Sequence, residues 1–279
     1  MTVINTNTSA AYAQNAMKTN ARFMSKAMEQ LSTGSRVNSA GDDAAGLAIG
    51  QNMTSQIRGL SMAIRNVNDG INMMQTSEGA MVEQSNMLQR MRELALQAMN
   101  GTYSNVQRGY LDKEFQELTS QIDQIANDTM WNDQAVLKGT SAGTSATFEF
   151  QAGQDADQTI SVTIGAMTAS GLKLVSGTET VSIGSGDTAA LALDVISSAL
   201  ETINAQRAAI GAGINRMQYT VDNLANIASN QTQSRSTILD TDYAIATTQL
   251  AKTQIIQQAS TAMLAQANQQ AQAVMALLK

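Results

Sequence analysis

The sequence contains no cysteine, no histidine and no proline, and each absence excludes a class of chemistry or structure. Without cysteine there are no disulfides and no thiolate chemistry. Without histidine the usual general base and the commonest zinc ligand are missing. Without proline the chain lacks the residue that most often ends a helix, so helices far longer than the globular mean of about a dozen residues become possible. These absences argue against most enzyme chemistry and favour long helices.

Aromatic residues are also scarce, with one Trp, four Phe and five Tyr in 279 residues. The chain is long enough to bury a sizeable core, so its apolar volume must come from Ala, Leu, Ile, Val and 17 Met. Such side chains suit the seams between packed helices.

The net charge of -6 leaves no basic patch of the kind that nucleic acid or anionic lipid requires. The first nine residues are polar and lack the features of a cleaved signal peptide, and no later stretch is apolar and long enough to span a bilayer. We therefore expect no nucleic-acid partner and no membrane insertion. Any export would use a route that does not read such a signal.

Composition divides the chain into helical arms at about 10–138 and 188–279, with a Gly/Ser/Thr-rich segment at 139–187 between them. The predicted fold is mainly α, a long antiparallel coiled-coil rod of paired N- and C-terminal arms with a small central β-hairpin region. We assign 46–138 and 188–239 to the two halves of the rod, 139–187 to the hairpin region, and 1–45 and 240–279 to terminal helical segments.

Apolar residues recur in both arms at alternating steps of three and four, the pattern of a coiled-coil seam. Each stripe must be covered, and the simplest partner for each is the other. Arg207 interrupts the second stripe. The predicted seam residues are Ile57, Leu60, Ile64, Val67, Ile71, Met74, Ile210, Ile214, Met217, Val221 and Leu224.

Local signals place the element boundaries. Asn100-Gly101 can close the first long helix, Ser39 to Asp42 resembles a capping box that opens it, and Asp187 can cap the return helix. Alternation with period two predicts a β-hairpin from 148–150 and 160–164, and 181–183 is a candidate short strand.

The outermost segments, 1–28 and 250–279, are rich in Ala, Gln, Asn and Thr and carry only narrow apolar stripes. Ordering a residue costs about 1 to 2 kcal/mol, so about 40 such residues need on the order of 2,000 Å² of apolar burial to offset the cost. A single chain offers no obvious surface of that size. We expect these segments to be disordered in the monomer and to fold on assembly.

Several motifs in both arms resemble those of bacterial flagellins, and the resemblance does not extend to the middle segment. In the first arm they are Ile4 to Asn7, Leu31 to Gly34, Arg36 to Ala40, Asp42 to Gly46 and Leu88 to Leu94. In the second arm they are Ile238 to Ala244, Gln254 to Ala259 and Leu264 to Gln269.

The resemblance implies a short flagellin, a structural, non-enzymatic subunit without cofactor or metal that polymerises into the extracellular filament used for swimming. Its terminal helices would line a central channel. The family also implies export through the flagellar type III apparatus, an export chaperone, and filament cap and hook-junction proteins as partners. The residues expected to carry polymerisation are Ile4, Ile255, Ile256, Met263, Val274, Leu277 and Leu278.

In some flagellins a Toll-like receptor reads the segment that corresponds here to Gln89, Arg90, Leu94 and Glu114. Met91 replaces the more usual valine. Considered without the family, Arg90 and its charged neighbours are a solvated helix face with ion pairs of a few tenths of a kcal/mol. The two interpretations are compatible.

Other candidate sites have simpler explanations. Asp42 and Asp43 are a possible catalytic or metal-binding pair, but adjacent carboxylates after Ser and Gly more often cap a helix. Gly184 to Gly186 is too short for a phosphate loop and lacks its lysine. Methionines on the seam fit core packing better than metal binding. Ser and Thr in 139–187 remain open to O-glycosylation.

Three rival functions remain. A hook–filament junction protein shares terminal helical features with flagellin, a surface adhesin could use the same scaffold to bind glycans, and a protease could occupy the insertion. The motifs favour flagellin over the first. The position of Trp131 outside the hairpin argues against a carbohydrate platform, and the lack of His and Cys argues against a protease.

Overall fold

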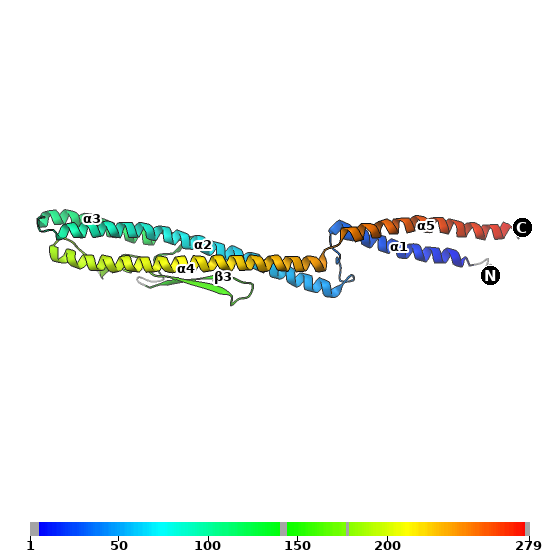
Figure 1. Ribbon diagram of the computed structural model, residues 1–279, viewed down its shortest axis with the longest axis horizontal. Helices are drawn as coiled ribbons and strands as arrows, with labels where there is room; N and C mark the ends of the chain where they lie inside the picture. The colour runs from blue at the N-terminus through cyan, green and yellow to red at the C-terminus, as the bar shows by residue number, and fades with distance from the viewer. Residues whose placement is uncertain (1–5, 140–143, 177–178, 277–279) are drawn as a thin grey trace. The chain divides into compact units, whose positions relative to one another are not determined.

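The computed structural model describes residues 6–139, 144–176 and 179–276, and Figure 1 shows its helices and strands. The described chain divides into two compact units, which we call unit 1 (Met1–Ile57 with Ser229–Lys279) and unit 2 (Arg58–Ala228). The helices are α1 (Thr8–Thr33), α2 (Ala44–Met99), α3 (Asn105–Asp128), α4 (Gly186–Leu239) and α5 (Tyr243–Ala276). The strands are β1 (Met130–Trp131), β2 (Gln134–Ala135), β3 (Ala146–Gln151), β4 (Thr159–Ile164), β5 (Val175–Ser176) and β6 (Glu179–Thr180).

The core of unit 2 is the seam between α2 and α4, with α3 packed back against α2. Along the middle of both long helices every seventh residue is inaccessible, which is the repeat of a coiled coil. The residues with 0% exposure at this spacing are Val67, Met74, Met81 and Leu88 on α2 and Ile196, Ile203, Ile210 and Met217 on α4. The mainly α fold with paired arms is therefore confirmed.

The break in the stripe at Arg207 has a specific partner. Arg207 Nη2 lies 3.7 Å from Glu78 Oε1 on α2, and both side chains are about one third exposed. The guanidinium therefore leaves the seam at its edge and meets a carboxylate, so the coiled-coil packing continues on either side.

The central hairpin forms at the expected place. Strands β3 and β4 pair antiparallel, with Phe148 opposite Val162 and Phe150 opposite Ile160. Gln206 of α4 fixes the hairpin's end, since its Oε1 accepts from the Gly165 N–H at 3.2 Å and its Nε2 donates to the Thr163 carbonyl at 2.9 Å.

Two local expectations are wrong. The first arm is not helical to residue 138, because α3 ends at Asp128 and a turn with positive φ at Asn132 and Asp133 joins β1 to β2. Residues 181–183 are not a strand, because the short pair is formed by β5 and β6 just before them.

The capping assignments are also corrected. Helix α2 is capped by Asp43, whose Oδ1 accepts from the Gly46 N–H at 2.9 Å, and not by a box that begins at Ser39. Helix α4 begins after Ser185, whose Oγ accepts from the Thr188 N–H at 3.3 Å, so Asp187 lies in the first turn. Within the described residues, no helix is long and apolar enough to cross a membrane.

Candidate self-assembly interface

Helices α1 and α5 of unit 1 lie alongside each other (Figure 1), and the seam between them is narrow and partly polar. Alanine supplies most of its apolar contact, with Ala27 2% and Ala246 4% exposed. Asn20 and Thr253 are buried in the same seam. Small side chains bring the helices close together but remove little apolar area from water.

Side-chain amides connect the two helices along their length. Asn20 Nδ2 donates to the Thr253 carbonyl at 2.8 Å and to Gln257 Oε1 at 3.2 Å, and Asn7 Nδ2 donates to the Ala267 carbonyl at 3.1 Å. A buried amide keeps its hydrogen bonds only in one alignment, so these contacts set the register of α1 against α5.

Large apolar side chains of this helix pair point away from the seam. Tyr12, Phe23 and Ile256 line one shallow groove across α1 and α5. The exposed large residues on the two helices are Tyr12, Phe23, Met28, Tyr243, Ile245, Ile255, Ile256 and Met263. These side chains leave apolar area in water that a contact with another protein could cover.

The predicted polymerisation residues are distributed as follows. Ile255 and Met263 are 66% and 65% exposed, and Ile256 is 38% exposed. Val274 is within α5, where only the backbone is described. Ile4, Leu277 and Leu278 lie outside the described residues.

The chain segments that follow α1 and α4 cross each other and form a short antiparallel bridge between Ser35 and Asp240. The Thr241 N–H donates to the Gly34 carbonyl at 3.0 Å, and the Arg36 N–H donates to the Leu239 carbonyl at 2.6 Å. The Arg36 guanidinium also donates to the Ile238 carbonyl at 2.6 Å. We call residues 34–36 and 239–241 the crossing.

Gly34 starts the crossing because it ends α1 with a left-handed φ of 71°, and its N–H donates to the Gln30 carbonyl. Tyr243 at the start of α5 donates from its hydroxyl to the Leu31 carbonyl at 3.4 Å. The motif residues of both arms therefore meet at one place in unit 1.

The Asp42 carboxylate ties the loop before α2 to α1. Lys26 Nζ lies 2.7 Å from its Oδ1, and its Oδ2 accepts from the N–H groups of Ser39 and Asn38 at 3.1 and 3.3 Å. The hydrogen bond from Lys26, followed by those from Ser39 and Asn38, lowers the pKa of Asp42 from 3.8 to about 2. With Asp43 on the α2 cap, both carboxylates have structural partners.

Two family models match the chain, one described as the bacterial flagellin N-terminal helical region over residues 4–142 and the other as the bacterial flagellin C-terminal helical region over residues 193–278. The chain belongs to the bacterial flagellin family. It is 39% identical to flagellin FlaB1 of Treponema pallidum over 99% of this chain and 100% of that protein. It is 40% identical to the flagellins of Halalkalibacterium halodurans and Bacillus subtilis, over 99% of this chain and 100% and 99% of theirs.

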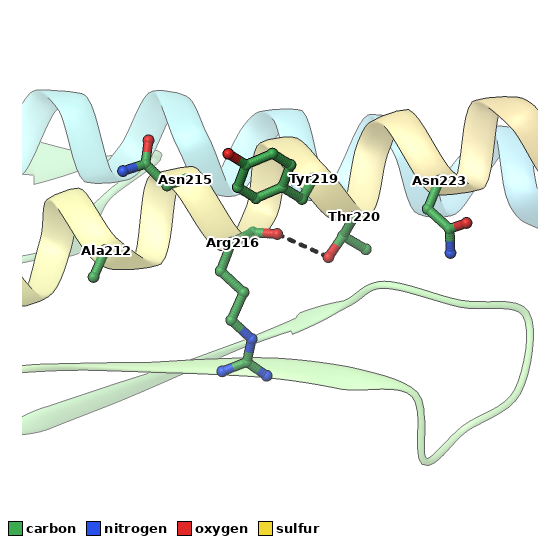
Figure 2. A pocket seen from close by; sticks show the side chains of 6 residues that line it. All are labelled: Ala212, Asn215, Arg216, Tyr219, Thr220 and Asn223. Atoms are coloured by element: carbon green, nitrogen blue, oxygen red, sulfur yellow. Dashed lines mark hydrogen bonds between the residues drawn. The ribbon is translucent and has the colours of Figure 1, made fainter.

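Membership of the flagellin family makes this protein a structural subunit of the extracellular flagellar filament and not an enzyme. The described residues contain no group of three or more acidic side chains placed to hold a metal ion. The groove in Figure 2 is lined by six residues that all come from one helix, α4. There the Arg216 side chain and the Tyr219 ring leave the helix in different directions.

The predicted seam residues of this flagellin are all buried or half-buried on α2 and α4. Leu60, Val67, Ile71, Met74, Ile210, Met217 and Leu224 are buried, and Ile57, Ile64, Ile214 and Val221 are half-buried. The half-buried members lie at the edge of the stripe and cover its buried members from solvent.

The segment assigned to receptor contact divides between surface and core. Arg90 Nη1 lies 3.0 Å from Glu93 and its Nη2 2.9 Å from Glu114 on α3, and Glu93 and then Glu114 raise the pKa of Arg90 above its ordinary value. Gln89 is exposed beside them. Leu94, however, is only 1% exposed and packs in the core of unit 2. Its side chain is therefore not part of any surface at this segment.

The sequence could not identify the residues that hold unit 1 together. Arg36 lies in a motif that we quoted, but its carbonyl partners are about two hundred positions away. Asn20 resembles any polar helix residue until α5 is placed against it. The one available signal is that a short amide side chain falls on the same helix face as Ala27, seven residues later.

Proposed function

We propose that this flagellin polymerises by burying the outward apolar side chains of α1 and α5 against neighbouring copies, and that the two helices become ordered as they assemble. One observation supports this most directly. The seam between α1 and α5 buries alanine and polar residues, while the large apolar side chains of both helices remain in water.

The energetics favour assembly over the isolated helix pair. Ordering each residue costs about 1 to 2 kcal/mol, and isolated helices gain little stability without tertiary packing. Full burial of one Ile, Phe or Met side chain contributes roughly 1.5 to 3 kcal/mol. A neighbour that covers Tyr12, Phe23, Ile255 and Met263 therefore adds stabilisation that one chain does not supply alone.

The same surface accounts for the partners that we propose before and during assembly. An exposed run of Ile255, Ile256 and Met263 promotes premature association, so an export chaperone that covers α5 would keep the subunit monomeric. Passage of an unfolded chain through the flagellar type III apparatus fits helices that order late. Filament cap and hook-junction proteins would then present complementary apolar faces at the filament's ends.

The test compares two substitutions on one helix. Ile255→Ser removes an apolar side chain that is 66% exposed, and Gln254→Ser changes an exposed polar neighbour. Purified monomers are seeded with wild-type filament fragments and followed by light scattering and electron microscopy. We expect Ile255→Ser to lengthen filaments several-fold more slowly than wild type and Gln254→Ser to match wild type. Equal growth of all three proteins would contradict the proposal.

We further propose that the charged face around Arg90 is a contact for a flagellin-sensing Toll-like receptor. Gln89, Arg90 and Glu114 are exposed, and the ion pairs to Arg90 hold that side chain across α2 and α3. Leu94 supports this face from below through packing.

Receptor-reporter cells test this proposal with monomeric protein. Arg90→Ala is expected to weaken signalling more than tenfold, a loss of about 1.4 kcal/mol or more at a central interface arginine. Lys113→Ala, on the exposed side of α3 beside Glu114, is the control and should change little. Unchanged signalling by Arg90→Ala would remove this face from the proposal without affecting assembly.

A further inference from the structure

We propose that Asn100 is a self-modifying site, at which the backbone nitrogen of Gly101 attacks the Asn100 side-chain amide and converts the residue to aspartate and isoaspartate. The proposal rests on the turn between α2 and α3 and does not depend on the assembly face.

The nucleophile is free and accessible. Asn100 and Gly101 are both exposed in the turn after Met99. The N–H groups on either side are occupied, since that of Asn100 donates to the Gln97 carbonyl at 3.2 Å and that of Thr102 donates to Asn100 Oδ1 at 3.2 Å. Among the hydrogen bonds of the described residues, the Gly101 N–H makes none, and nothing lies within 4 Å of the place where a Cβ on Gly101 would stand.

The electrophile is activated by the same turn. The Thr102 N–H donates to Asn100 Oδ1 at 3.2 Å. This donor polarises the side-chain carbonyl and stabilises the negative charge that develops on its oxygen when a nucleophile adds, as a donor in an oxyanion hole does. Asn100 Nδ2, the leaving group, donates no hydrogen bond within the described part of the chain.

The reaction balances without any cofactor. A bond forms between the Gly101 nitrogen and Asn100 Cγ, the bond from Cγ to Nδ2 breaks, and Nδ2 leaves as ammonia with the proton that the Gly101 nitrogen loses. Water then opens the cyclic imide at one of its two carbonyls. One opening yields aspartate, and the other yields isoaspartate, which adds a methylene to the main chain.

The product changes the charge at a defined place. A carboxylate at the carboxyl end of α2 opposes the helix dipole, because that end already carries partial negative charge. Arg108 brings a cation to this turn, since its Nη2 donates to the Asn100 carbonyl at 3.3 Å and its Nε has no hydrogen-bond partner among the described residues. The isoaspartate form also lengthens the main chain in the connection between α2 and α3.

Asn38 provides a matched contrast within the protein. It also lies in a loop, but its Nδ2 donates to the Ser35 carbonyl at 2.9 Å, and the following N–H, of Ser39, donates to Asp42 at 3.1 Å. Both the leaving group and the nucleophile are held there, and Ser39 carries a side chain. Asn38 should therefore remain unmodified under conditions that convert Asn100.

The experiment incubates the full-length protein in mildly alkaline buffer and follows each asparagine by peptide mass spectrometry. Isoaspartate is labelled with an isoaspartyl methyltransferase. We expect the peptide that contains Asn100 to become one mass unit heavier and to be labelled, several-fold faster than the Asn38 peptide.

Two variants make the result specific. Gly101→Ala puts a methyl group beside the nucleophile without strain, since Gly101 is not among the glycines with positive φ and its surroundings are open. It should slow conversion several-fold and leave the circular dichroism spectrum, and therefore the helical fold, unchanged. Asn100→Gln, whose longer side chain would need a larger ring, should abolish conversion at this position. Conversion of Asn38 as fast as Asn100, or an unchanged rate in Gly101→Ala, would overturn the proposal.

Discussion

The Asp42 carboxylate joins α1 to the loop before α2, so its protonation should weaken that connection. Its pKa is about 2, below the ordinary 3.8, because Lys26 and two backbone N–H groups bind the charged form. A lowered folded-state pKa contributes stability that is complete above pH 3.8 and is lost as the pH falls from there toward about 2.

We therefore expect acid to loosen the loop before α2 in wild type, and Asp42→Asn to loosen it already at neutral pH. The measurement is urea unfolding of both proteins at several pH values, with the Asp42 carboxyl followed by NMR. Lys26→Met is the control for cause, because it should move the pKa of Asp42 back toward 3.8. Parallel stability curves for wild type and Asp42→Asn across this pH range would contradict the assignment.

At this loop the role of the two carboxylates was easier to predict than the groups that they bind. The two adjacent carboxylates indicated helix capping, and one of them, Asp43, does cap α2. The other binds Lys26, sixteen residues earlier, in an arrangement that depends on the path of the whole loop. Gly46 shows the same limit. It must lack a side chain because the Asp43 carboxylate occupies the place where a Cβ on Gly46 would stand, and the sequence does not show that contact.

Helix α2 offers two glycines with opposite surroundings. At Gly70 an added Cβ would lie 2.8 Å from Phe150 Cδ1 of the hairpin, and at Gly79 it would meet nothing within 4 Å. We expect Gly70→Ala to destabilise the protein by about 1 to 3 kcal/mol, because the Phe150 ring must move away from α2 to make room for the methyl group. Gly79→Ala should stabilise it by roughly 0.5 to 1 kcal/mol through helix propensity.

Chemical denaturation of the two variants and wild type checks whether the free energy of unfolding falls for Gly70→Ala and rises for Gly79→Ala. The intrinsic preference for alanine over glycine in a helix is the same at both positions. The difference between them therefore isolates the contact between α2 and β3. If Gly70→Ala proved as stable as Gly79→Ala, Phe150 of the hairpin would not pack against α2 at Gly70.

The long helices and the main hairpin could be predicted because a seven-residue repeat and a two-residue alternation are each visible in the sequence. What could not be predicted depends on tertiary partners. Residues 129–138 read as helix by composition, yet Asn132 and Asp133 take positive φ and turn the chain into β1 and β2. In the sequence Arg207 only interrupts the apolar stripe, because Glu78, the carboxylate that it meets, lies on the other arm.

The two units differ in how much apolar surface each one buries. The large cluster of buried apolar side chains belongs to unit 2 and draws on α2, α3, α4 and the hairpin. Helix α1, with 26 residues, buries only Asn20 and Ala27. The predicted domain limit at 45/46 lies in the first turn of α2 and the one at 239/240 lies at the end of α4, whereas the limits of unit 1 fall further inside both helices. Contacts such as Arg235 with Thr54 hold those helix ends to unit 1.

This difference predicts a gradient of local stability that assembly should remove. Backbone amides exchange quickly where few apolar contacts must break to open a helix. In the monomer we expect the amides of α1 and α5 to exchange with deuterium far faster than those facing the α2–α4 seam, and in filaments to become protected. Ile255→Ser, mixed with filament fragments, should gain this protection several-fold more slowly than wild type. Protection of α1 in the monomer equal to that of α2 would mean that the helix pair is already stable alone. The outward apolar side chains would then join preformed helices, and assembly would proceed by docking without coupled folding.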